Sequence, residues 1–317
     1  MTTLDPQAKA LIDMVYRVGA PRFHDLDVAK ARHSFQKLQF ALRPEAPAVA
    51  SVADVPIPRA HAREGVIMGR LYRPLNSAAG DALPLVFYFH GGGWCVGDLA
   101  SYDVLCRELA NQSGAAVLSV DYALAPEHPF PAAVNDALRA VEWSLENAAL
   151  LGVDPARFAL MGDSAGGTLS AVTALQLRDL QGPRPALQVL VYPCTDIRST
   201  RPSRSAYADG YMLDEGSLVW FFEKYLPNAA DHADWRASPL LAPDLGDLPP
   251  ALLILAGCDP LVDDGLAYAE ALRTAASPAE AVVYPGLVHG FFTLGKFFPQ
   301  AGEAVQRCAQ ALAQAFA

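Results

Sequence analysis

The sequence has 317 residues, of which 52% are hydrophobic and 18% are charged, and its formal net charge is −10. This composition indicates a globular protein with a substantial apolar core and excludes an intrinsically disordered chain. Nucleic acids and anionic membranes select basic surfaces, so the acidic balance argues against either one as the main partner.

The predicted elements alternate along most of the chain. Residues 1–43 have apolar positions at a three-to-four spacing, which predicts helices, and the Gly-Ala-Pro run at 19–21 divides them into two. Prolines between residues 44 and 58 indicate a linker and an edge strand. The predicted strands are residues 66–72, 84–89, 115–121, 157–161, 187–192, 251–256 and 281–284, and the predicted helices are 102–112, 132–149, 168–180, 265–275 and 300–316. This alternation predicts a mostly parallel, doubly wound sheet with helices on both faces.

One long connection interrupts the alternation. Almost sixty residues separate the strand that ends near Pro193 from the strand that begins near Ala251. A connection of this length is normally functional when it is not disordered. Its aromatic content, which includes Trp220 and Tyr225, argues against disorder, so we predict that it forms a lid.

A Gly-x-Ser-x-Gly sequence occupies residues 162–166. An apolar run precedes it and a helical segment follows it, which is the strand-turn-helix setting of a nucleophile elbow. The flanking glycines suit such a turn, because side chains two positions from the serine would collide with the strand and the helix. We therefore predict that Ser164 is a nucleophile.

A His-Gly-Gly-Gly sequence at residues 90–93 follows the strongest early strand. Consecutive glycines allow backbone N–H groups to face a substrate oxygen at close range. We predict that the N–H groups of Gly91, Gly92 and Ala165 form an oxyanion hole, since Ala165 is the residue after the nucleophile. We expect His90 to brace this loop by hydrogen bonding rather than to act as a base.

A serine nucleophile needs a base, and the base needs an orienting carboxylate. Where the serine lies in a strand-turn-helix elbow, the three residues follow in the chain order serine, acid, histidine. Downstream of Ser164 the candidate histidines are His232, in a polar run of the predicted lid, and His289, in a glycine-containing loop after the last predicted strand. Position at a strand end favours His289 as the base.

Three aspartates compete for the role of the acid. Asp259 directly follows the predicted strand at 251–256, whereas Asp263 and Asp264 come one turn later and suit the first turn of a helix. The strand-end position favours Asp259. The remaining histidines show no metal-ligand spacing, so we expect neither a metal nor a cofactor.

Five motifs in order resemble the hormone-sensitive-lipase family of carboxylesterases. They are the His-Gly-Gly-Gly-Trp sequence at 90–94, the Asp-Tyr and Leu-Ala-Pro-Glu-His-Pro-Phe-Pro-Ala sequences within 121–132, the Gly-Asp-Ser-Ala-Gly-Gly sequence at 162–167, Asp-Pro-Leu at 259–261 and His-Gly-Phe at 289–291. The resemblance covers about residues 84–292. It departs at Ala123, where the family usually has an arginine.

This resemblance implies an α/β-hydrolase fold, with a mostly parallel eight-stranded sheet, helices on both faces and a helical cap. Residues 1–47 and 196–242 would form the two parts of the cap, and residues 48–195 and 243–317 would form the core. It also implies a serine carboxylesterase for short- to medium-chain acyl esters that works through an acyl-enzyme. Ser164, His289 and Asp259 would form its triad, and a homodimer is possible.

Two other functions stay open. An amidase or peptidase would use the same triad, whereas a ligand receptor on this fold would lack the catalytic histidine, so His289 counts against it.

The expected partner is a small-molecule ester. The sequence contains no run of 18 uncharged apolar residues, so we predict no membrane span. The start of the chain shows no signal-peptide pattern. The five cysteines lack Cys-x-x-Cys spacing, which favours a reducing, cytoplasmic location.

Overall fold

A computed structural model describes residues 3–59, 65–78 and 80–317. Its strands are β1 (Ser51–Pro58), β2 (Val66–Arg73), β3 (Leu83–Phe89), β4 (Ala116–Asp121), β5 (Val153–Asp163), β6 (Gln188–Val191), β7 (Ala251–Cys258) and β8 (Ala279–Val288). They form one eight-stranded sheet in the order β1-β2-β4-β3-β5-β6-β7-β8. The pairs β1–β2 and β2–β4 are antiparallel, and the other neighbours are parallel. The predicted mostly parallel sheet and its edge strand near residue 58 are confirmed.

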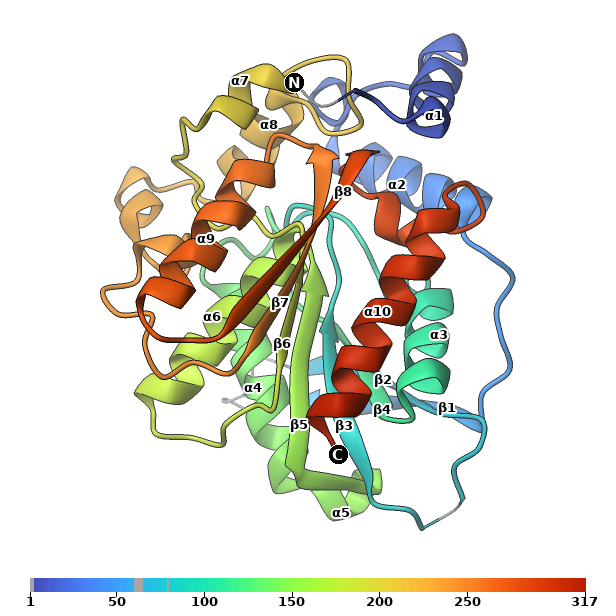
Figure 1. Ribbon diagram of the computed structural model, residues 1–317, viewed down its shortest axis with the longest axis vertical. Helices are drawn as coiled ribbons and strands as arrows, with labels where there is room; N and C mark the ends of the chain where they lie inside the picture. Colours follow the sequence, from blue (N-terminus) through green and yellow to red (C-terminus); the bar gives the residue numbers. More distant parts are fainter. Residues whose placement is uncertain (1–2, 60–64, 79) are drawn as a thin grey trace.

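Helices cover both faces of the sheet (Figure 1). The helices α3 (Asp103–Ser113) and α10 (Pro299–Ala315) lie on one face, and α4 (Ala132–Glu146), α6 (Ala165–Asp179) and α9 (Val262–Thr274) lie on the other. The helix predicted at 132–149 is two helices, because α4 ends at Glu146 and the short α5 (Ala148–Leu151) begins after Asn147, which caps both. Among the described residues, no helix is both long and apolar enough to span a bilayer.

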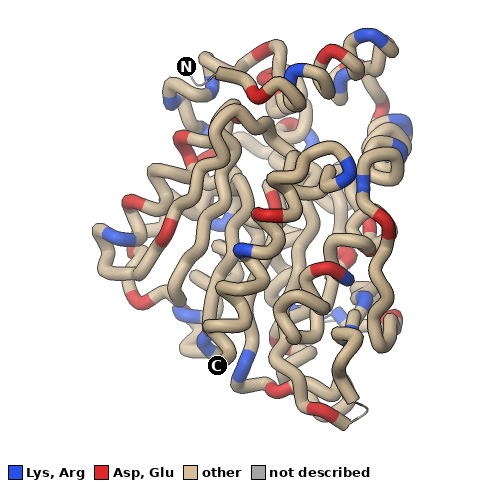
Figure 2. The backbone as a smooth tube through the Cα atoms, turned by 45° about the vertical axis from the view of Figure 1, so that its right-hand side comes forward, with Lys and Arg blue, Asp and Glu red and all other residues tan. Residues whose placement is uncertain are grey.

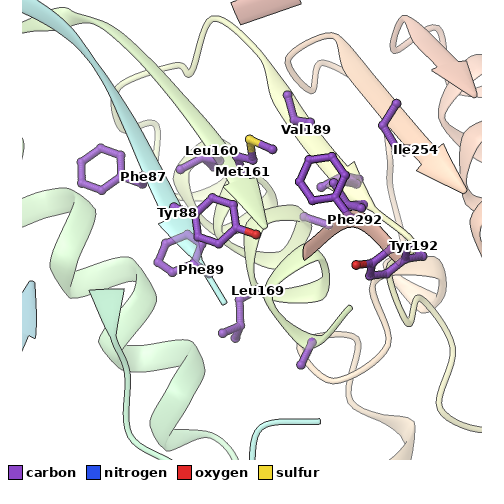
Figure 3. Close-up of a cluster of buried hydrophobic side chains, with 14 of the residues drawn as sticks. Phe87, Tyr88, Phe89, Leu160, Met161, Leu169, Val189, Tyr192, Ile254 and Phe292 are labelled. Atoms are coloured by element: carbon purple, nitrogen blue, oxygen red, sulfur yellow. The ribbon is translucent and has the colours of Figure 1, made fainter. Parts of the chain in front are cut away.

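The core of the sheet is apolar on both faces. Every residue of β6 and of β7 is buried, as expected for strands covered by helices on two sides. Figure 3 shows part of this core, in which successive side chains of β3 alternate in direction. The rings of Phe87 and Phe158 meet edge to face at 6.1 Å, while Tyr88 carries its hydroxyl group toward the carboxyl end of β5.

Two segments, residues 3–47 and 196–242, lie beyond the carboxyl ends of the parallel strands (Figure 1), and we call them the upper segments. Their helices are α1 (Pro6–Arg17), α2 (Val28–Leu42), α7 (Pro202–Ala206) and α8 (Glu215–Tyr225). Short 3₁₀ turns occur at Phe23–Asp25, Ala229–Ala233, Pro239–Leu241 and Phe291–Thr293. The predicted break near residue 20 is confirmed, since α1 ends before it and α2 begins after it. The first two residues of the predicted cap lie outside the described residues.

Charged side chains join the upper segments to the rest of the molecule. The Arg32 guanidinium of α2 donates to both carboxylate oxygens of Glu127, at 2.9 and 2.6 Å, in the loop after β4. The Arg204 guanidinium of α7 donates to the Asp264 carboxylate of α9 at 2.6 Å, and this carboxylate is fully buried. An ion pair therefore joins each upper segment to the rest of the molecule, one through the loop after β4 and one through α9.

Ala123, the position at which the chain departs from the family pattern, lies beside a paired carboxylate. The backbone N–H of Ala123 donates to the Asp136 carboxylate of α4 at 2.9 Å. The Arg59 guanidinium, which follows β1, donates to the same carboxylate at 2.8 and 2.7 Å. Arg59 thus neutralises Asp136 from a different part of the chain.

All five cysteines lie within the described residues and are buried thiols, as expected for packing residues; they are Cys95, Cys106, Cys194, Cys258 and Cys308. Burial raises the pKa of the Cys95 and Cys194 thiols to about 12. Because the thiolate is the reactive form, both side chains are unreactive at neutral pH.

Candidate active site

Ser164 lies in a tight turn between β5 and α6. Its backbone has φ 53° and ψ −117°, a sparsely populated conformation for a residue with a side chain. Its N–H donates to the Val191 carbonyl of β6 at 2.8 Å, which holds the turn in place. A Cβ atom on Gly162 or Gly166 would overlap the Phe89 carbonyl oxygen of β3. Both glycines of the motif are therefore required for the turn to pack against the sheet.

His289 bridges the other two residues of the predicted triad. Its Nε2 lies 2.9 Å from the Ser164 Oγ, and its Nδ1 lies 2.7 Å from the Asp259 Oδ2. Asp259 is fully buried, and its other oxygen accepts the Leu261 N–H at 2.9 Å. These side chains reach one another because β5, β7 and β8 are parallel and end at the same edge of the sheet. An imidazole held between a carboxylate and a hydroxyl group can accept the hydroxyl proton.

The alternative candidates have other partners. His232 Nε2 lies 3.1 Å from a backbone carbonyl of its own segment. The Asp263 carboxylate accepts the Ser203 N–H at 2.8 Å, and Asp264 forms the buried ion pair with Arg204. Both aspartates therefore hold the second upper segment against α9.

The glycine loop differs in detail from the prediction. The Gly91 N–H donates to the Asp163 Oδ1 at 2.8 Å and lies 3.0 Å from the Tyr102 hydroxyl oxygen, so it is already engaged. The next two glycines, Gly92 and Gly93, line a cavity beside Ser164. Gly93 has φ 56°, and a Cβ atom there would overlap the Phe221 ring of α8.

The carboxylate of Asp163 explains this difference. It is buried beside Ser164 and accepts hydrogen bonds from the hydroxyl groups of Tyr88 and Tyr102, at 2.8 and 3.1 Å, in addition to the Gly91 N–H. Burial raises the pKa of Asp163, and these three donors oppose that rise. The sequence signal for this arrangement is an acidic residue inside the elbow motif, which must find donors once it is buried.

His90 packs within the loop, as predicted. Its Nδ1 lies 2.8 Å from the Gly91 carbonyl oxygen. Its ring stacks on Tyr122 at 4.3 Å, and the Tyr122 hydroxyl group donates to the His90 carbonyl at 2.7 Å. These contacts fix the direction of the glycine N–H groups that follow.

The ring of Tyr192 packs against His289, although the sequence does not single out this tyrosine. Its ring centroid lies 4.5 Å from the imidazole centroid of His289. Its backbone has φ 34°, and its N–H donates to the Ile254 carbonyl at 2.7 Å. A positive φ at a tyrosine one residue after a short strand has no sequence signal, because it is imposed by the packing of β6 against β7.

A cavity of about 100 Å³ opens beside Ser164 and His289, and we call it the Ser164 cavity. Most of its lining is apolar, and both upper segments contribute. The first supplies Phe23, Phe35, Leu38 and Gln39, and the second supplies Met212, Leu213, Leu218, Phe221 and Phe222. Such a cavity suits a small, largely apolar ligand.

Comparison with known proteins places the chain in a family. A family model described as the α/β-hydrolase fold matches residues 86–293. The chain is 39% identical to the ethyl acetate hydrolase of Pseudomonas putida, over 92% of this chain and 91% of that protein. It is also 39% identical to the carboxylesterase NlhH of Mycobacterium tuberculosis, over 98% of this chain and 96% of that protein.

Solved structures agree with this result. An ester hydrolase from the metagenome of Lake Arreo, in complex with a bipyridine phosphonate derivative, is 41% identical with a TM-score of 0.94, over 98% of this chain and 99% of that chain. A hyperthermophilic esterase from the archaeon Pyrobaculum calidifontis is 39% identical with a TM-score of 0.92, over 98% of each chain. With a family model that covers most of the chain and relatives this similar over nearly its full length, the protein belongs to the hormone-sensitive-lipase family of α/β-hydrolase carboxylesterases.

Proposed function

We propose that this carboxylesterase hydrolyses short- to medium-chain acyl esters through a Ser164–His289–Asp259 triad and an acyl-enzyme. The observation that carries the proposal is the position of His289, whose two ring nitrogens lie 2.9 Å from the Ser164 hydroxyl oxygen and 2.7 Å from the Asp259 carboxylate. This chain of contacts provides a nucleophile, a base and an orienting acid.

In the first half-reaction the Ser164 Oγ attacks the ester carbonyl carbon while His289 Nε2 takes the hydroxyl proton. Asp259 accepts the Nδ1–H hydrogen bond and stabilises the imidazolium. The tetrahedral intermediate then expels the alcohol, whose oxygen receives the proton from His289. In the second half-reaction water attacks the acyl-enzyme, His289 takes its proton, and Ser164 leaves as the protonated hydroxyl group.

We propose that the oxyanion accepts hydrogen bonds from the N–H groups of Gly92, Gly93 and Ala165. Gly91 is replaced in this set because its N–H donates to Asp163. Ala165 is the first residue of α6, so its N–H belongs to the unpaired set at a helix N-terminus, where the dipole favours negative charge.

We further propose that the upper segments act as a cap that limits chain length. Each buried methylene contributes about 0.8 kcal/mol, so kcat/KM should rise from acetate until the acyl chain fills the Ser164 cavity, at roughly four to eight carbons. Beyond that length further methylenes meet the wall or remain in water. Measuring kcat/KM for p-nitrophenyl esters from acetate to palmitate tests this. Faster hydrolysis of palmitate than of butyrate would contradict it.

The nucleophile is tested by covalent labelling with a phosphonate ester. Mass spectrometry should find the phosphorus on Ser164, and Ser164→Ala should abolish labelling and lower kcat on the order of 10⁴-fold or more. Labelling of another residue, or an active Ser164→Ala variant, would overturn the assignment. Parallel assays with p-nitrophenyl butyrate and the corresponding p-nitroanilide distinguish an esterase from an amidase, because both substrates release a coloured product.

A further inference from the structure

Helix α2 presents an amide to the Ser164 cavity. Of its fifteen residues, only Ala31 and Gln39 are buried, and Gln39 is 4% exposed. Its side chain lines the cavity next to Phe35 and Leu38 of the same helix. A polar side chain therefore occupies a position that faces a largely apolar space.

The Gln39 amide has no hydrogen-bond partner in the part of the chain that the structure describes. Its Oε1 is buried and unpartnered. By contrast, Gln36, three residues earlier, donates to the Asp98 carboxylate at 2.9 Å. A buried amide without a partner is destabilising, and a leucine at this position would fill the same space without that cost. Departures of this kind from good packing are expected where a ligand supplies the missing partner.

We propose that Gln39 determines substrate specificity by hydrogen bonding to a second polar group, so that preferred esters carry a hydroxyl, carbonyl or amide group on the part that lies against α2. This inference rests on the proposed esterase function. A carboxamide both donates and accepts, so it pairs with neutral polar groups of either kind. A charged group is excluded from this role, because the neighbouring lining residues Phe35 and Leu38 offer it no counter-ion.

The competing explanation is a resident water molecule that satisfies the amide. A buried water needs two to four polar partners. The side chains beside Gln39 on α2 that line the cavity are apolar and offer a water no hydrogen-bond partner. The two explanations differ in their effect on substrate choice, since a resident water would not discriminate between esters.

The test compares matched esters that differ by one hydroxyl group. Ethyl hexanoate is paired with derivatives that carry a hydroxyl group at successive positions of the acyl chain, and hexyl acetate with the equivalent series on the alcohol chain. The ratio of kcat/KM within each pair is measured for the wild type, for Gln39→Leu and for Gln36→Leu. The last variant is the matched control, because it makes the same change on the same helix outside the Ser164 cavity.

We expect one position in one series at which Gln39→Leu lowers the preference for the hydroxy ester by about tenfold, while Gln36→Leu keeps the wild-type ratio. Gln39→Leu should also raise Tm, because it removes an unpartnered buried amide, whereas a purely structural role would lower Tm. Ratios unchanged by Gln39→Leu at every position would overturn the inference and indicate a resident water. Failure of the wild type to hydrolyse the unsubstituted esters would instead overturn the proposed function.

Discussion

Every residue of β6 and of β7 is buried, whereas α2, which lines the Ser164 cavity, buries only Ala31 and Gln39. The sheet is held by ladder hydrogen bonds and by apolar side chains packed on both faces. Charged residues are sparse along the central strands and frequent in the outer helices and loops, as Figure 2 shows. The central sheet and the outer helices therefore differ in the side chains that surround them.

Charged contacts also join the two upper segments to each other. Arg22 of the first segment lies 2.8 Å from Asp209 of the second; the Arg22 side chain is partly exposed and the Asp209 side chain is largely exposed. Exposed ion pairs contribute little and are screened by salt. Changes at the strand ends should therefore act on the chemical step, while changes in the upper segments should act on stability and on the shape of the cavity.

The largest effect is expected at the strand ends. Asp259→Asn should lower kcat by roughly 10⁴-fold, because an amide favours the wrong imidazole tautomer. Asp263→Asn is the control, since Asp263 holds the Ser203 N–H and does not take part in the proposed reaction. Steady-state kinetics with p-nitrophenyl butyrate measure both. Equal losses in the two variants would show that the acid has been assigned to the wrong residue.

A smaller effect is expected where α7 meets α9. Among the described residues, Arg204→Met leaves the fully buried Asp264 carboxylate with only the Arg201 guanidinium, 3.4 Å away, as a cationic partner. Removing one partner of a buried pair costs about 3–5 kcal/mol, and the remaining arginine should place the loss near the lower end. Urea unfolding measures this change in the free energy of unfolding.

The double variant Arg204→Met/Asp264→Leu sharpens that result. Replacing both charges with apolar side chains removes the stranded carboxylate, so much of the lost stability should return. A double variant no more stable than the single one would mean that the pair is needed for the packing of α7 itself.

The smallest effect is expected at the contact between α2 and the loop after β4. Hydrogen bonds from Arg32 hold the pKa of Glu127 below its ordinary value. The pair therefore stabilises the fold above the unfolded pKa of about 4.3, and this contribution is lost as the pH falls through the lower folded value. Because the Glu127 side chain is 54% exposed, Glu127→Gln should cost at most about 1 kcal/mol at neutral pH.

Thermal unfolding of the wild type and Glu127→Gln between neutral and acidic pH checks this contribution. The difference in Tm should shrink as the solution becomes more acidic. A difference that grows in acid would show that the Glu127 carboxylate does not stabilise the fold through its charge.

Much of the site could be predicted from the sequence because its residues follow buried parallel strands. The Gly-x-Ser-x-Gly motif singles out Ser164, and chain order and strand-end position single out Asp259 and His289. The structure brings these three side chains into contact. The direction of the Gly91 N–H could not be predicted in this way. It depends on which donors reach the buried Asp163 carboxylate, and those donors come from β3 and from the residue preceding α3.

The sequence also does not predict which face of α2 lines the Ser164 cavity. Its sequence predicts a helix, but its few buried positions do not mark which face meets a cavity, because that face is set by how the upper segments pack on the sheet. From the sequence alone, Gln39 would be assigned to the solvent-facing side of the helix. The tertiary structure instead places it beside Phe35 and Leu38 in the cavity wall. The division of α4 and α5 at Asn147 was missed for a simpler reason, since both halves contain good helix formers.

Because all five native thiols are buried, a cysteine introduced on the surface could be used to attach this protein to a support at one chosen position. Maleimides react with thiolates, so a cysteine introduced at an exposed position would be modified in preference to the native ones. Leu150 of α5 is 75% exposed, and α5 lies at the end of the molecule opposite the upper segments (Figure 1). A Leu150→Cys variant could therefore be tethered to a surface in one orientation, with the Ser164 cavity facing away from the surface.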